Sequence, residues 1–206
     1  MPGLLGKKLG MTSVFIEDGK SVPVTVIEAG PCHIYAVKSD EKDGYSALQL
    51  GYGERKEKRV NKPQLEVYKK NGLTPPQKLT EFRNFEGNEY KIGDVIKVDI
   101  FTEGEKVKVT GKTKGKGFQG VMRRHGFGGV GGTTHGQSDR LRHPGSIGQS
   151  SDPSRVFKGT RMAGRTGHTN STVSNLRVVK ILPEKNIIMV KGAVPGSINS
   201  IVEINK

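Results

Sequence analysis

The sequence predicts a mainly β protein, a small barrel built from both ends of the chain and interrupted by one long basic loop. Short runs rich in β-branched residues, separated by turn signals, fill residues 1–110 and 171–206. Between them, residues 111–170 lose this alternation and contain 15 of the 29 glycines. We therefore divide the chain into a β body and a glycine-rich arm.

In the first part of the body, four runs have the alternation of half-buried strands, at residues 11–16, 22–27, 33–37 and 47–50. The dipeptides Asp18-Gly19 and Asp43-Gly44 predict hairpin turns, because a type I′ turn needs positive φ at its central residues. Strands of this length at this spacing favour a small barrel over a sandwich of long strands.

Residues from about 54 to 90 predict a surface insertion into this body. Charges of both signs crowd residues 54–59, which is typical of a solvated face, and a short helix is expected from Gln64 to Lys70, ending near Asn71-Gly72. Further strands are expected at residues 79–85, 95–101, 106–110, 173–181, 186–190 and 201–204.

The charge distribution indicates the class of partner. Lys and Arg number 34 against 20 Asp and Glu, a formal charge of +14 with a sequence pI near 9.9. Residues 111–170 hold eleven Lys and Arg and two Asp, a net charge of +9, which leaves +5 for the other 146 residues. A merely soluble, highly charged protein is the plain alternative, but this concentration favours binding to nucleic acid.

Other function classes receive no support from the sequence. No run approaches the roughly 20 apolar residues of a membrane helix, and the N-terminus lacks a signal-peptide pattern, so we expect a cytoplasmic protein with no membrane partner. Cys32 is the single cysteine, which excludes an intramolecular disulfide and favours a small buried side chain over a nucleophile.

Two interpretations compete for the arm, a flexible linker and a segment that becomes ordered inside RNA. Linkers are dominated by Gly and Ser, whereas the arm interleaves bases, histidines and aromatic rings, with a short helix expected at residues 118–124. The expected RNA contacts are the cationic, imidazole and aromatic side chains Lys112, Lys114, Lys116, Phe118, Arg123, Arg124, His125, His135, Arg140, Arg142, His143, Arg155, Lys158, Arg161, Arg165 and His168.

The same segment has features that superficially resemble enzyme sites. Residues 112–118 lack the Ser or Thr that follows Gly-Lys in a nucleotide-binding P-loop. Four of the five histidines lie in the arm, but their spacing fits no zinc motif and no cysteine lies near them. We expect neither cofactor nor catalysis. The rival hypothesis, an enzyme that uses this histidine-rich arm as its site, predicts bound zinc or nucleotide in the purified protein.

Several motifs together resemble one family, the universal large-subunit ribosomal proteins of the L-three family in their bacterial form. They are GKKLGMT at residues 6–12, GKGFQG at 115–120, HPGSIG at 143–148, VFKG at 156–159, MAG at 162–164 and VKGAVPG at 190–196. The resemblance implies a six-stranded barrel like that of translation factors, with an inserted α+β subdomain and a basic loop that extends toward the peptidyl transferase centre.

The same resemblance implies a function and a modification. It implies a non-enzymatic structural protein that binds large-subunit ribosomal RNA, acts early in subunit assembly and touches neighbouring large-subunit proteins. It also marks Gln149, which follows the HPGSIG motif, as a position that a glutamine methyltransferase converts to N5-methylglutamine in bacterial relatives. The alternative is an unmodified glutamine that is hydrogen-bonded to RNA.

Overall fold

The chain divides into two compact units, which are described separately. The computed structural model describes residues 2–16, 19–83, 85, 90–131, 135–136 and 139–206. The body unit comprises Met1–Thr113 and Asn170–Lys206, and the arm unit comprises Lys114–Thr169. Asp18 of the first expected turn, and residue 84 of the strand expected at 79–85, lie outside the described residues.

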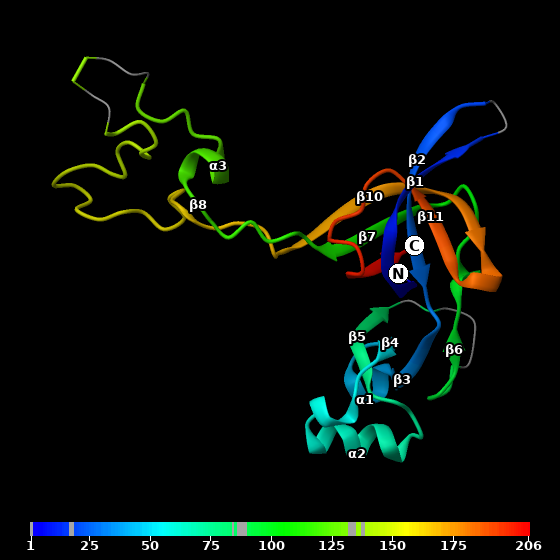
Figure 1. The fold of residues 1–206 in the computed structure, drawn as a ribbon. Helices are drawn as coiled ribbons and strands as arrows, with labels where there is room; N and C mark the ends of the chain where they lie inside the picture. Colours follow the sequence, from blue (N-terminus) through cyan, green and yellow to red (C-terminus); the bar gives the residue numbers. More distant parts are fainter. Residues whose placement is uncertain (1, 17–18, 84, 86–89, 132–134, 137–138) are drawn as a thin grey trace. The chain divides into compact units, whose positions relative to one another are not determined.

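The body unit contains a closed barrel of six antiparallel strands (Figure 1). Its two terminal strands pair with each other, with Gly3 opposite Asn205, so the barrel joins both ends of the chain. The expected mainly β fold with a six-stranded barrel is confirmed. In order around the barrel the strands are β1 (Gly3–Phe15), β12 (Ile201–Asn205), β7 (Lys106–Lys112), β10 (Asn170–Leu182), β11 (Ile187–Lys191) and β2 (Ser21–Ala29).

The barrel closes because each strand turns alternate apolar side chains inward. In β7 the buried positions are Val107, Val109 and Gly111, with exposed or half-buried residues between them. Gly6 allows β1 to approach β2 closely, since an added Cβ would lie 2.6 Å from the Glu28 carbonyl oxygen. This close approach gives one physical reason for glycine in the GKKLG stretch.

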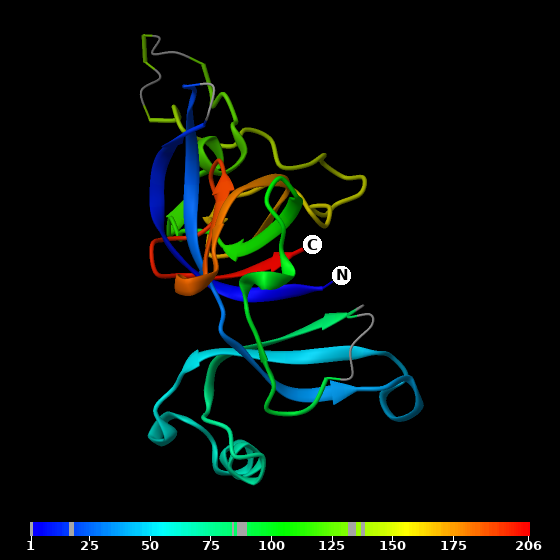
Figure 2. The same cartoon turned by 90° about the vertical axis from the view of Figure 1, so that its right-hand side faces the viewer.

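A second sheet of the body unit has the order β5-β4-β3-β6, with strands β3 (Cys32–Lys38), β4 (Ala47–Glu54), β5 (Pro76–Arg83) and β6 (Val95–Ile96) (Figure 2). Beside it lie the short α1 (Asp40–Asp43), η1 (Glu57–Arg59) and α2 (Lys62–Lys70). The helix expected at 64–70 is therefore present, and it ends at Asn71 as expected.

The assignment of residues 33–37 and 47–50 to the barrel was wrong. These strands pair with each other, and the α+β insertion thus begins well before residue 54. Half-buried strands have the same local pattern in either sheet, so the pairing partner is not encoded locally. The strand expected at 95–101 is also shorter, because β6 is followed by the 3-10 turn η2 (Val98–Ile100).

The remaining elements are short. The turn η3 (Pro183–Lys185) joins β10 to β11, and the arm unit contains β8 (Phe118–Gln119), α3 (Val121–His125) and β9 (Gly164–Arg165). No helix in the described part of the chain is long and apolar enough to cross a membrane.

Cys32 has no exposed surface, and its thiol donates to the Leu5 carbonyl oxygen at 3.3 Å. Burial raises the pKa of this thiol to about 12, against an ordinary 9.0. We predict that an aromatic disulfide reagent labels the native protein at least about a thousandfold more slowly than the unfolded chain, because only the thiolate attacks. Absorbance measures this rate, and rapid labelling without denaturant would contradict the buried position.

Candidate nucleic-acid interface

The two ends of the arm unit run antiparallel and are hydrogen-bonded to each other. The N–H of Lys116 donates to the Thr166 carbonyl oxygen, and the N–H of Thr166 donates to that of Gly117, both at 2.9 Å. The pairing continues in β8 and β9, where Phe118 lies opposite Arg165. An aromatic residue whose side chain is 76% exposed is thus paired along the backbone with an exposed arginine, a combination suited to base stacking and to phosphate binding.

Helix α3 begins after Gly120 and ends at Gly126, whose φ of +75° closes the helix in the left-handed region. Arg124 Nη1 donates to the Met162 carbonyl oxygen at 2.7 Å, and His125 Nε2 lies 3.0 Å from the same oxygen. Gly164 leaves space for this contact, since an added Cβ would lie 2.6 Å from Arg124 Nη1. Arg124 and His125 therefore use part of their hydrogen-bonding capacity to join the two ends of the arm unit.

The arm unit has almost no hydrophobic core. Among its described apolar residues only Val121 is buried. Six large apolar side chains are exposed, namely Phe118, Leu141, Ile147, Val156, Phe157 and Met162. As expected for residues 125–167, this segment has too little buried surface to offset the entropy of ordering, and its apolar side chains are available to a partner.

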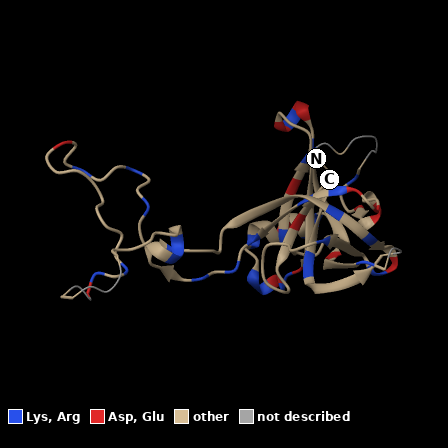
Figure 3. Ribbon diagram, turned by 90° about the horizontal axis from the view of Figure 1, so that it is seen from above, with Lys and Arg blue, Asp and Glu red and all other residues tan. Residues whose placement is uncertain are grey.

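The charge of the arm unit is not balanced within the chain. It contains ten Lys and Arg and two acids, a net of +8, and blue segments recur along its trace in Figure 3. The ion pairs between described residues lie in the body unit, such as Lys38 with Glu81 at 3.1 Å. None of them involves a Lys or Arg of the arm unit. Such uncompensated charge favours a polyanionic partner.

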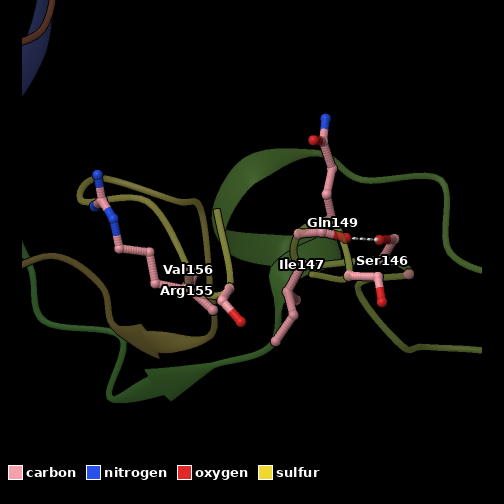
Figure 4. A pocket seen from close by; sticks show the side chains of 9 residues that line it. Ser146, Ile147, Gln149, Arg155 and Val156 are labelled. Atoms are coloured by element: carbon pink, nitrogen blue, oxygen red, sulfur yellow. Dashed lines mark hydrogen bonds between the residues drawn. The ribbon is translucent and has the colours of Figure 1, made fainter. Parts of the chain in front are cut away.

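A loop of the arm unit presents Gln149 and Arg155 around an open hollow of about 530 Å³ (Figure 4). Ser146 Oγ donates to the Gly148 carbonyl oxygen at 2.9 Å and stabilises the turn before Gln149. The Gln149 amide extends outward and makes no hydrogen bond with the described residues. Arg155 Cζ lies 5.3 Å from the centre of the Phe157 ring, which restrains the guanidinium by a cation–π contact.

The sixteen side chains expected to bind RNA are all exposed except half-buried His125. Lys112 lies at the end of β7 in the body unit, and the other fifteen lie in the arm unit. The structure pairs Phe118 with Arg165 along the backbone and joins Arg124 and His125 at one acceptor. Among the described residues, no hydrogen bond or ion pair connects the side chains of Arg140, Arg142, His143, Lys158 and Arg161 with one another. Within the described residues, no group of three His, Cys, Asp or Glu could hold a metal ion.

Sequence reasoning missed two features of this interface. The Met162 carbonyl oxygen serves as the acceptor for Arg124 and His125, and no local pattern points to a backbone contact between residues so far apart. Exposed Leu141, Ile147 and Val156 also escaped notice, because isolated apolar residues in a polar segment give no periodic signal.

Comparisons with known proteins agree on one family. The family model described as ribosomal protein L3 matches residues 54–186. The chain is 60% identical over 205 residues to the large ribosomal subunit protein uL3 of Chlorobaculum parvum, covering 99% of this chain and 98% of that protein. It is 56% identical, with the same coverage, to the large ribosomal subunit protein uL3 of Salinibacter ruber.

Proposed function

Because this chain belongs to the ribosomal protein L3 family, we propose that its arm unit binds large-subunit ribosomal RNA directly. Family membership makes the chain a structural constituent of the large ribosomal subunit and not an enzyme, with ribosomal RNA and other ribosomal proteins as its partners. The observation that carries the proposal is the arm unit itself, which has a net charge of +8, no ion pair among its described Lys and Arg side chains and almost no core.

The physical basis of binding is neutralisation of phosphates. Fixed Lys and Arg side chains release the mobile ions that otherwise condense on folded RNA, so the favourable entropy of release drives association. Exposed Phe118 and Phe157 add stacking on unpaired bases. The left-handed backbone at glycines such as Gly145 and Gly159 allows the chain to turn sharply without a side chain between backbone and RNA.

We propose that the arm unit enters the subunit early in assembly and extends toward the peptidyl transferase centre. A coreless segment gains order from the RNA that surrounds it, and threading it into RNA that has already compacted would require that RNA to reopen. The arm unit would then stabilise the shape of the RNA near this centre while it supplies no catalytic group. The family resemblance supports this proposed location in the RNA.

The proposal is tested by the salt dependence of binding between the purified chain and isolated large-subunit ribosomal RNA. We expect the logarithm of affinity to fall linearly with the logarithm of salt concentration, by about 0.7–0.9 per phosphate contact. An affinity that does not change with salt would contradict phosphate binding.

We propose further that Gln149 is the substrate of a glutamine methyltransferase, supported by its exposed amide with no partner among the described residues. In large subunits from the source cells, we predict that the peptide spanning residues 143–155 is heavier by one methylene group. Gln119 is the matched control, because its amide already donates to the Lys116 carbonyl oxygen. Mass spectrometry reads both peptides, and a peptide 143–155 of unmodified mass would contradict the proposal.

A further inference from the structure

The hairpin of β1 and β2 continues beyond the closed part of the barrel (Figures 1 and 2). Strand β1 pairs with β12 only from Gly3 to Lys7, whereas it pairs with β2 as far as Phe15. Within the part of the chain that the structure describes, no strand therefore pairs with Met11–Phe15 on the side opposite β2. We call this stretch the free edge.

The direction of the backbone groups follows from β2. The Pro23 carbonyl oxygen accepts from the N–H of Gly192 at 2.9 Å, away from β1. Because the backbone groups of successive strand residues alternate between the two sides, Val22 and Val24 direct theirs toward β1. Their partners in β1 are Val14 and Thr12.

Residues Met11, Ser13 and Phe15 consequently direct their N–H and C=O groups away from β2. The pairing of Ser13 with Pro23 agrees, since proline has no N–H to give a hydrogen bond there. No other described residue forms a backbone hydrogen bond with the outward N–H or C=O groups of these three residues. The side chains beside them are apolar and exposed, Met11 by 53% and Phe15 by 74%.

We propose that the free edge binds an extended strand of a neighbouring large-subunit protein, which adds to β1 as a further antiparallel or parallel strand. Alternating N–H donors and C=O acceptors at every second residue are complementary to another polypeptide strand. Phosphate oxygens, in contrast, only accept hydrogen bonds and would leave the carbonyl groups unpaired.

Charge also favours a protein over RNA at this surface. Residues 9–15 of β1 and 21–27 of β2 contain no charged side chain, in a chain whose net charge is +14. A surface without Lys or Arg offers no counter-charge to phosphates, so it favours a polypeptide over RNA as the occupant. The inference rests on the membership of the large subunit and not on the RNA contacts proposed for the arm unit.

The test uses whole large subunits from cells in which this chain is the only copy. Phe15 is replaced by the photo-cross-linker p-benzoylphenylalanine, and the same replacement at Ile198, which is 64% exposed on a loop of the body unit, is the control. After irradiation we expect Phe15 to give a product with one other large-subunit protein that resists nuclease. A product that nuclease removes, a product between two copies of this chain, or no product at Phe15 would overturn the proposal.

A pair of backbone variants shows whether strand pairing makes the contact. Ser13→Pro removes an outward N–H without touching a bond to β2, and Ser13→Ala retains it. Since one hydrogen bond contributes about 0.5–1.5 kcal/mol, we expect Ser13→Pro to lower the cross-link yield at Phe15 about threefold to tenfold and Ser13→Ala to leave it unchanged. An equal yield in both variants would exclude pairing along the free edge.

If Ser13→Pro fails to fold, hydrogen exchange of the unmodified chain decides the question. We expect the amides of Met11, Ser13 and Phe15 to exchange rapidly in the free protein and slowly in the assembled subunit. Rapid exchange in the subunit would overturn the proposal. Neither measurement depends on the affinity of the arm unit for RNA, so failure here leaves the proposed function standing.

Discussion

Replacement of residues 126–160 by a short Gly-Ser linker is expected to yield a soluble, cooperatively melting protein that enters large subunits poorly. The buried apolar core of the body unit is drawn from residues 4–109 and 178–204, and none of its members lies in the replaced segment. Because each halving of loop length changes the closure cost by only about 0.6 kcal/mol, the free energy of unfolding should change by no more than about 2 kcal/mol.

Assembly should respond very differently from stability. The replacement removes Arg140, Arg142, Arg155 and Lys158, four of the ten Lys and Arg side chains of the arm unit, and none of the four forms an ion pair with a described residue. Melting is measured by circular dichroism, and incorporation by sedimentation of subunits from cells that express the variant beside the wild-type chain. An unfolded product would show that residues 126–160 contribute to the core of the body unit. Normal incorporation would show that this segment is not needed for subunit assembly.

Substitution of Arg140, Arg142 and Arg155 by alanine should weaken binding to large-subunit ribosomal RNA about a hundredfold near physiological salt. Release of counterions from one phosphate contributes about 1 kcal/mol under these conditions, and three contacts sum to about 3 kcal/mol. The salt slope should fall by about one per contact. Binding is measured by filter retention across a salt series.

Two matched variants isolate the cause of this loss. Lysine at the same three positions keeps the charge and removes the planar fork, so it should retain the salt slope while it loses any bidentate or stacking contact. Alanine at Arg55, Lys58 and Arg59 removes equal charge from an exposed, mixed-charge segment of the body unit and should change affinity much less. Equal losses in the two alanine variants would mean that net charge alone governs binding.

Much of the fold could be predicted from the sequence, because alternation of apolar residues reports which segments are half-buried strands. The closing strands 173–181, 186–190 and 201–204 were located to within a few residues. The sheet to which a strand belongs was not predictable, as residues 33–37 and 47–50 show. Helix α3 begins at Val121 and not at 118, because Phe118 and Gln119 pair with a strand more than forty residues away.

The candidate interface was predictable in composition but not in geometry. The excess of Lys and Arg, the scarcity of acids and the glycines are local properties, and they identify the arm unit without a structure. That Arg124 and His125 meet at the Met162 carbonyl oxygen depends on long-range pairing. The free edge at Met11–Phe15 was equally invisible, because only the barrel shows where β12 ends beside β1.

The central claim is that the arm unit contacts ribosomal RNA through its Lys and Arg side chains. It is tested most directly by a structure of the intact large subunit from the same cells. We predict that the guanidinium groups of Arg140, Arg142 and Arg155 lie within hydrogen-bonding distance of RNA phosphates or stack on bases. The claim would be contradicted if the Lys and Arg side chains of the arm unit faced solvent or lay only against other proteins.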